Sequence, residues 1–392
     1  MSSAATRVGD PLIPQIANDF GTGVGAAAVV TTAFAFAYGV CQLVHGPFGD
    51  RFGKVRVVTL AAACSALGMA SVAAANSLVT LGLFRFLGGI TASAVIPLSM
   101  AYIGDVVPYE QRQATLARFL FGQILGTVFG QIAGGVLGEF LHWRAIFLVF
   151  GALYVVAAAV LAMEMRSGRV VDRRDAVELT PMAILRRYAG LLARRRVRIV
   201  LAVVFIEAVL FYGGFTFFGA YLHTRFGLDY ARIGLMLAFF GVGGLVYVAF
   251  ARRLIATLGE RGFAVAGGIV LCLAFIAAPF AGSGPGFAAV ATGCGLGFYM
   301  MHTTLQTNAT QMAPEARGSA VSIFASCLFI GSAIGVAIGG AMIERVGYGA
   351  LFTASGVGLL GLGFGFNLLL AAIRREAATS SSRAASADTP AR

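Results

Sequence analysis

The feature that most constrains this chain is a series of long apolar segments separated by short polar connections. A helix needs about 20 apolar residues to cross a bilayer, and a single segment can cross it only as a helix. Only 12% of the 392 residues are charged, against about 25% in soluble domains. The sequence therefore predicts an all-α polytopic membrane protein. Full spans are expected at about 24–45, 55–75, 77–103, 114–138, 142–164, 197–222, 230–255, 262–282, 285–311, 317–342 and 348–372.

An arginine-rich connection divides these segments into two sets. Residues 1–164 are expected to form an N-terminal helix bundle and residues 197–373 a C-terminal one, joined by a cytoplasmic basic linker at 165–196. Residues 374–392 are rich in Ser, Ala and Arg and have no apolar surface to bury. We expect this tail to be disordered.

An internal repeat supports the division into two halves. A shift of 205 residues superposes identical residues of the two halves, and such self-similarity is typical of membrane proteins built from repeats. The matched pairs are Glu110 and Glu315, Arg112 and Arg317, Gly126 and Gly331, Gly130 and Gly335, Gly134 and Gly339, Gly135 and Gly340, Glu139 and Glu344, Ala145 and Ala350, Phe147 and Phe352, and Gly151 and Gly356. The repeat predicts two similar bundles of six helices.

The start of the chain does not provide a complete first helix of this repeat. Residues 1–18 contain few apolar side chains and include Arg7, Asp10, Pro11 and Pro14. We therefore expect eleven full spans plus a partial first one. The same shortfall leads us to expect an in-frame upstream start that adds about ten apolar residues, unless the first helix is simply short.

The charge distribution indicates membrane topology and not nucleic-acid binding. The net charge is +12, but the basic residues cluster in the connections, as the positive-inside rule requires. This pattern predicts that the linker and the C-terminus lie in the cytoplasm, and we expect the membrane to be the inner (plasma) membrane. No phosphate-binding loop of the form G-x-x-x-x-G-K-[ST] occurs, so we do not expect ATP to supply energy.

The cysteines and the first residues give no sign of a disulfide framework, a metal site or a signal peptide. The five cysteines lie singly in apolar segments, without the spacing of a disulfide framework or of metal ligands. We expect no metal site and no cofactor. The opening residues MSSAATRVGD have no apolar h-region, so no cleavable signal peptide is expected.

A charged, glycine-bearing stretch, GPFGDRFGKVR, separates the first two full spans, and we predict that it forms a cytoplasmic hinge loop. Gly53 can take the positive φ of a tight turn. Asp50 can bind free N–H groups at a helix end or a cation, and so hold one conformation of a moving protein. The stretch resembles the loop 2–3 signature of the major facilitator superfamily, G-x-L-a-D-R-x-G-r-k. The matching residues are Gly46, Phe48, Gly49, Asp50, Arg51, Gly53 and Lys54.

This resemblance implies a major facilitator fold of two pseudo-symmetric six-helix bundles around a central cavity. It also implies a monomeric secondary transporter, not an enzyme, that moves a small molecule by alternating access. Within the superfamily the chain looks closest to the drug:proton and sugar-efflux antiporters, so proton-coupled efflux is the leading interpretation. A proton symporter or facilitator importing a nutrient, and a non-transporting receptor on the same scaffold, remain alternatives.

Two further motifs in the N-terminal half resemble those of the family. Arg85, with Leu81 and Gly89, is similar to the helix-4 motif l-x-x-x-R-x-x-q-G, which implies a role in proton coupling. The alternative is a structural arginine bound by backbone carbonyls. A glycine ladder resembles the helix-5 antiporter motif G-x-x-x-G-P-x-x-G-G, with Gln131 in place of the proline, and close helix packing explains it equally well. The ladder comprises Gly126, Gly130, Gly134 and Gly135.

Glu207 is the candidate proton site, because it lies near the middle of a full-length apolar segment. A charged carboxylate there costs about 2.5–3.5 kcal/mol, so protonation and release can follow changes in water access. A neutral or ion-paired glutamate that only fixes packing is the alternative. The side chains expected to line the cavity and bind substrate are Tyr38, Gln42, His302 and Gln306.

Overall fold

The computed structural model describes residues 1–168, 170, 181–313 and 316–387. Within these ranges the chain is helical, with short turns and no strand. Nine helical segments of the described chain are long and apolar enough to cross a membrane. The predicted all-α polytopic architecture is therefore confirmed, whereas the expected number of spans stays a prediction.

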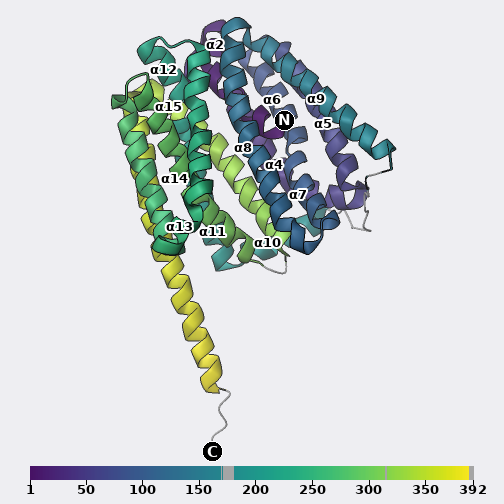
Figure 1. Ribbon diagram of the computed structural model, residues 1–392, viewed down its shortest axis with the longest axis vertical. Coiled ribbons are helices and arrows are strands. Elements are labelled where there is room, and N and C mark those ends of the chain that lie inside the picture. Colours follow the sequence, from purple (N-terminus) through teal and green to yellow (C-terminus); the bar gives the residue numbers. More distant parts are fainter. Residues whose placement is uncertain (169, 171–180, 314–315, 388–392) are drawn as a thin grey trace, which may run out of the picture.

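The N-terminal half contains the helices up to α9 (Figure 1). Their bounds are α1 (Ser2–Arg7), η1 (Asp10–Leu12), α2 (Ile13–Asp19), α3 (Val24–Ala27), α4 (Val29–Phe52), α5 (Lys54–Ala73), α6 (Leu78–Ala92), α7 (Val95–Val106), α8 (Tyr109–Phe140) and α9 (Trp143–Arg166). The predicted span at 77–103 is divided between α6 and α7. Pro97 accounts for the division, because its ring cannot donate a hydrogen bond and collides with the carbonyl of Ser93, four residues earlier.

The C-terminal half begins after the short helix α10. The bounds are α10 (Pro181–Leu192), α11 (Arg195–Phe215), α12 (Phe218–Phe226), α13 (Tyr230–Ala277), η2 (Ala278–Phe280), α14 (Pro285–Gln311) and α15 (Arg317–Ala387). Both α13 and α15 are interrupted by one glycine, Gly259 with φ of 65° and Gly347 with φ of 80°. These breaks fall in the two connections that the sequence predicts.

Several boundaries predicted from the sequence differ from the observed helix ends or fall outside the described residues. The predicted hinge loop at 46–56 is wrong: α4 continues to Phe52 and α5 begins at Lys54, which leaves Gly53 alone between them. Gly53 has the predicted positive φ, 95°. Helix α15 runs to Ala387, into the expected tail. Residues 169, 171–180 and 388–392 of the linker and tail lie outside the described residues, and the domain boundaries stay predictions.

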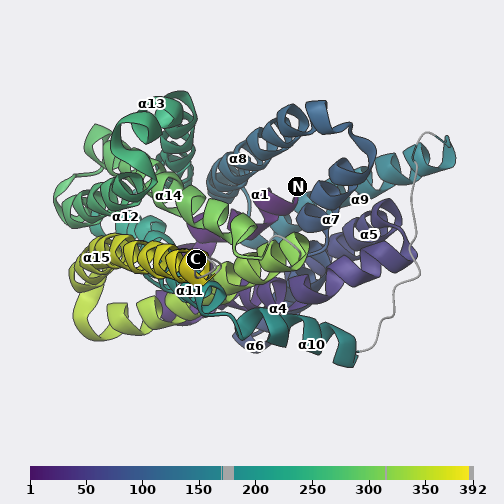
Figure 2. The same ribbon diagram turned by 90° about the horizontal axis from the view of Figure 1, so that it is seen from below.

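The two halves lie side by side, with α4 against α15 and α8 against α13 at their junction (Figures 1 and 2). Two glycine-to-glycine contacts bring the backbone of α15 against α3 and that of α8 against α13. A Cβ on Gly340 would lie 2.7 Å from the Cα of Gly25, and one on Gly234 would lie 2.8 Å from the Cα of Gly135. We call these two contacts the glycine crossings.

A glutamate one turn beyond each crossing reaches into the opposite half. The N–H of Tyr230, at the start of α13, donates a hydrogen bond of 2.8 Å to Glu139 Oε2. Glu344 Oε1 lies against Gly23 and Gly25 at the start of α3. Because Glu139 and Glu344 are a matched pair of the repeat, each half places an equivalent glutamate against the other half.

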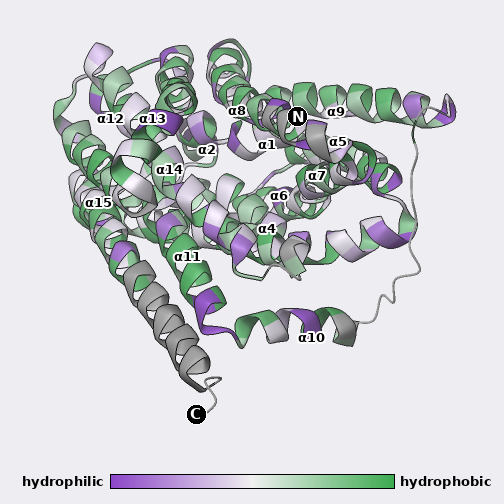
Figure 3. Cartoon of the chain, turned by 60° about the horizontal axis from the view of Figure 1, so that its bottom comes forward, coloured by the Kyte–Doolittle hydropathy of each residue, from purple (hydrophilic) through white to green (hydrophobic). Residues whose placement is uncertain are grey.

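Helix α10 lies at one end of the molecule, where it contacts α11 and α15, and carries both hydrophilic and hydrophobic residues (Figure 3). A free carbonyl group in α4 holds α10 in place. Pro47 lacks the N–H that would bond the carbonyl of Leu43, four residues earlier in α4. The hydroxyl of Tyr188 in α10 donates a hydrogen bond to that carbonyl at 3.0 Å. A helix-internal proline thus provides the acceptor that attaches α10 to the N-terminal half. We call the end of the molecule that carries α10 the linker end.

Candidate functional site

A cavity of about 1070 Å³ lies between the two halves. Its wall extends from Ser3 and Tyr212, deep in the molecule, to Asp50 and to Tyr188 of α10 at the linker end. The side chain of Asp50 is 36% exposed, so this end is open. The glycine crossings lie toward the other end, where the halves are in contact. In the part of the chain that the structure describes, the cavity therefore opens at the linker end.

Four residues predicted to line the cavity do so. They are Tyr38, Gln42, His302 and Gln306. Tyr38 on α4 stacks on Phe329 of α15, with ring centroids 4.1 Å apart, so this pair joins the halves at the cavity wall. Gln42, one turn further along α4, is only 4% exposed. Their roles in binding stay predictions.

Glu207 and His302 form a pair at the cavity wall. Glu207 on α11 is completely buried, and its Oε2 lies 2.9 Å from Nδ1 of His302 on α14. The other carboxyl oxygen, Oε1, has no hydrogen-bond partner. His302 lines the cavity and also stacks on Phe298 at 5.0 Å. The imidazole is thus placed between the carboxyl group and the cavity, a pairing that the sequence did not indicate.

A smaller chamber of about 140 Å³ lies beside the deep end of the cavity and shares part of its wall. Arg7 lines it, bonded through Nη1 to Asp10 Oδ2 at 3.2 Å and stacked 4.1 Å over the ring of Tyr212. Asp10 also accepts a hydrogen bond from Thr31 at 3.0 Å. We call this space the inner chamber. The sequence analysis did not single out Arg7, although an arginine three residues before an aspartate is the spacing of a helical ion pair.

Arg85 lies outside both cavity walls. Its Nε donates to the carbonyl of Val30 at 2.6 Å and its Nη2 to that of Ala5 at 3.3 Å, while the guanidinium lies 4.2 Å from the ring centre of Phe34. These bonds attach the partial first helix to α4 and α6. The coupling role of Arg85 remains a prediction, and the contacts favour the alternative of a structural arginine.

The residues predicted to gate conformational change lie at the open end of the cavity. Lys54, only 9% exposed, bonds Asp50 at 2.9 Å and also Asp105 of α7 at 2.7 Å. Gly46, Asp50 and Lys54 line the cavity. Asp105 was not predicted, because its segment lacks the motif that marks Asp50. The remaining members of the predicted set include Gly49, which faces Leu98, and the exposed Arg51.

The glycine ladder packs against two different neighbours. Gly126, Gly130 and Gly134 face α1 and η1, whereas Gly135 forms a crossing with Gly234 of α13. The ladder therefore serves close packing in this structure, and the antiporter role that its motif implies stays a prediction. Gln131, at the position of the motif's proline, is buried and faces the inner chamber.

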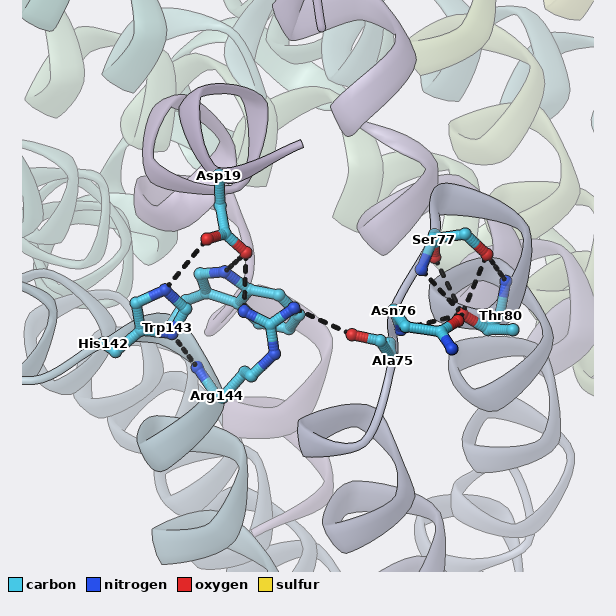
Figure 4. A network of polar contacts seen from close by, with 8 residues as sticks. All are labelled: Asp19, Ala75, Asn76, Ser77, Thr80, His142, Trp143 and Arg144. Atoms are coloured by element: carbon cyan, nitrogen blue, oxygen red, sulfur yellow. Dashed lines mark hydrogen bonds and ion pairs between the residues drawn. The ribbon is translucent and has the colours of Figure 1, made fainter. Parts of the chain in front are cut away.

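A separate polar network surrounds Asp19 at the end of α2 (Figure 4). Asp19 accepts hydrogen bonds from Arg144 at 2.5 Å, from Trp143 Nε1 at 3.1 Å and from His142 at 3.3 Å. Arg144 also donates to the carbonyl of Ala75 at 2.8 Å. Partial burial acts to raise the pKa of Asp19, but these hydrogen bonds and the charge of Arg144 outweigh it and hold the pKa below its ordinary value.

Among the described residues, no group of three or more His, Cys, Asp or Glu side chains is placed to hold a metal ion.

The helical spans and the central cavity, open at one end, define a polytopic membrane transporter. The chain belongs to the Major Facilitator Superfamily, whose model matches residues 1–324. It is 24% identical over 338 residues to YceJ, an MFS-type transporter of Bacillus subtilis, covering 85% of this chain and 84% of that protein. It is 27% identical to a chloramphenicol resistance protein of Streptomyces lividans, over 66% and 65% of the two chains. Its fold is similar to that of a mutant of the nucleoside transporter NupG, with a TM-score of 0.74 at 11% identity over 93% and 96% of the chains. The major facilitator fold is confirmed, and such transporters are not enzymes.

Proposed function

We propose that this protein is a proton-coupled exporter of a small molecule and that Glu207 carries the coupling proton. The observation that supports the proposal most is the pair formed by Glu207, which is completely buried, and His302, which lines the cavity. A buried carboxylate needs a compensating partner, and a histidine is the side chain suited to transfer protons near neutral pH.

The pair can move a proton between the cavity and the protein interior. One proton in the 2.9 Å contact lies on His302 Nδ1 or on Glu207 Oε2. When the carboxyl group is protonated, the pair is neutral. When the proton leaves through His302 into the cavity, the remaining charge needs a new partner or access to water. Gain and loss of the proton therefore favour different arrangements of α11 and α14.

The direction of transport and the orientation of the protein in the membrane are parts of this proposal. Two relatives support export: the chloramphenicol resistance protein of Streptomyces lividans and a bicyclomycin resistance protein homolog of Haemophilus influenzae. The basic connections support placing the linker end in the cytoplasm of an inner-membrane protein. In this orientation the open cavity faces the cytoplasm, the side from which an exporter collects its substrate.

The test compares Glu207→Gln with the native protein. A thermal-shift screen of purified protein first identifies a small molecule that binds, and its flux is then measured in inverted membrane vesicles with and without a proton gradient. The Gln variant should retain binding and substrate exchange but lose gradient-driven flux, because a neutral amide resembles the protonated acid and cannot release a proton.

The matched control is Glu164→Gln, which removes an exposed carboxylate at the end of α9. It should transport at the native rate. Undiminished gradient-driven flux in Glu207→Gln would overturn the coupling role. Gradient-driven accumulation in the opposite direction by the native protein would show import, and an absence of flux for every bound compound would show a receptor.

A further inference from the structure

Gln131 presents an amide with no hydrogen-bond partner to the inner chamber. It lies on α8, one turn before the crossing at Gly135, and its side chain is completely buried. Neither its Oε1 nor its Nε2 has a partner. Burying a polar group without a hydrogen bond destabilises a protein, so this amide is suited to a partner that enters the chamber.

The charged groups near Gln131 already have partners within the protein. Arg7 bonds Asp10 and stacks on Tyr212, and Asp10 also accepts from Thr31. Because the positive charge of Arg7 is balanced by the carboxylate of Asp10, the chamber does not require a charged ligand. What remains to be satisfied is one neutral donor and one neutral acceptor on the same side chain.

Aromatic side chains form part of the wall of the inner chamber, beside polar ones such as Thr6 and Ser332. Six of its lining residues are Tyr212, Phe215, Phe240, Phe298, Tyr299 and Phe329. Aromatic walls favour flat, uncharged molecules, which stack on the ring faces. The chamber adjoins the main cavity, with which it shares Ser3, Gln123 and Thr127, and we take the main cavity as the route by which a ligand enters.

We propose that Gln131 recognises an uncharged, planar substrate that carries a lactam or another cis amide edge. Such an edge presents N–H and C=O side by side, and a primary amide pairs with it through two complementary hydrogen bonds. Both orphan atoms of Gln131 are then satisfied at once. This inference rests on the proposed function only in taking the cavity as the route of the substrate.

Two probes of nearly identical shape test the proposal. 2-Quinolone is a planar lactam, and coumarin is the corresponding lactone, which lacks the N–H donor. Calorimetric titration of the purified native protein in detergent should give at least about tenfold tighter binding of 2-quinolone, since the lactone leaves the carbonyl of Gln131 unpaired. In Gln131→Leu the two probes should bind with equal affinity.

Two more variants make the result decisive. Gln131→Met keeps the volume of the side chain and should also abolish the preference for 2-quinolone. It therefore tests the proposal even if the Leu variant misfolds. Gln111→Leu changes an exposed glutamine on the same helix and should keep the preference. Equal affinities in the native protein, no binding of 2-quinolone, or a preference that survives in either Gln131 variant would overturn the proposal. The assay contains no proton gradient, so its failure leaves the test of Glu207 in vesicles unaffected.

Discussion

At the scale of single residues, Asp19 illustrates how one carboxylate can connect three segments. It joins the end of α2 to the start of α9, and Arg144 extends the connection to Ala75, just after α5. The aspartate is 28% exposed, and its pKa is held below the ordinary value of 3.8. A carboxylate with a lowered pKa stabilises the fold above the pKa that it has in the unfolded chain.

We predict that Asp19→Asn lowers stability by roughly 0.5–1 kcal/mol at neutral pH, the range for a partly exposed ion pair. The difference from the native protein should disappear as the pH falls below 3.8 through the folded pKa of Asp19, because the native carboxylate is then protonated as well. Melting temperatures of both proteins in detergent, recorded from pH 7 to pH 3, measure this. Arg144→Gln should give the same loss at neutral pH, and a constant difference at all pH values would contradict the assignment.

The sequence identified several site residues but not how they combine. Glu207 and His302 were each recognisable as polar groups in apolar segments, yet their contact depends on the rotation of α11 against α14 about their axes. A pattern of apolar residues does not determine this rotation when a helix is apolar on nearly all sides. Gln131 was visible only as a departure from a motif, because its burial arises from packing against η1 and α13.

At the scale of elements, Pro47 and Tyr188 form a small joint between α4 and α10. The hydroxyl of Tyr188 satisfies the carbonyl that Pro47 leaves free, and it also interacts with Ser322 of α15. One side chain of the linker therefore contacts both halves at the open end of the cavity.

We predict that Tyr188→Phe loosens α10 without unfolding the bundles. Losing one hydrogen bond of this kind costs about 1 kcal/mol, which should increase amide hydrogen exchange in α10 roughly fivefold. Exchange mass spectrometry of the purified protein measures this. Pro47→Ala should have a similar effect, because the restored N–H of residue 47 competes for the carbonyl of Leu43. Unchanged exchange in both variants would show that other contacts hold α10.

The sequence predicted the ends of some helices well and the ends of others poorly. The predicted spans at 55–75 and 142–164 end within about two residues of α5 and α9, whereas α4 continues to Phe52, beyond its predicted end at 45. The segment from Gly46 to Phe52 was assigned to a loop because of its glycines and charges. It is nevertheless the last part of α4, and the Asp50–Lys54 ion pair crosses the break at Gly53 and joins α4 to α5.

At the scale of the whole molecule, Lys54 connects α4, α5 and α7 beside the open cavity through Asp50 and Asp105. We predict that Asp50→Asn reduces transport about fivefold or more while membrane abundance stays near normal. Removing one of two carboxylates shifts the balance between conformations by on the order of 1 kcal/mol, while Asp105 still holds the lysine in the fold. Flux normalised to the amount of protein in the membrane measures the effect. Asp105→Asn should behave alike, and normal flux in the Asp50 variant would contradict a gating role.

The glycine crossings have a consequence for how the molecule is assembled. Gly135 and Gly340 lie in different halves, and each contacts a glycine of the other half, Gly234 or Gly25. Neither half alone possesses both sides of a crossing. If the halves were synthesised as separate chains, each would expose a narrow strip of bare backbone to lipid, and the strip that fits it lies on the other half. The same contacts that close one end of the cavity therefore also select the correct partner during folding.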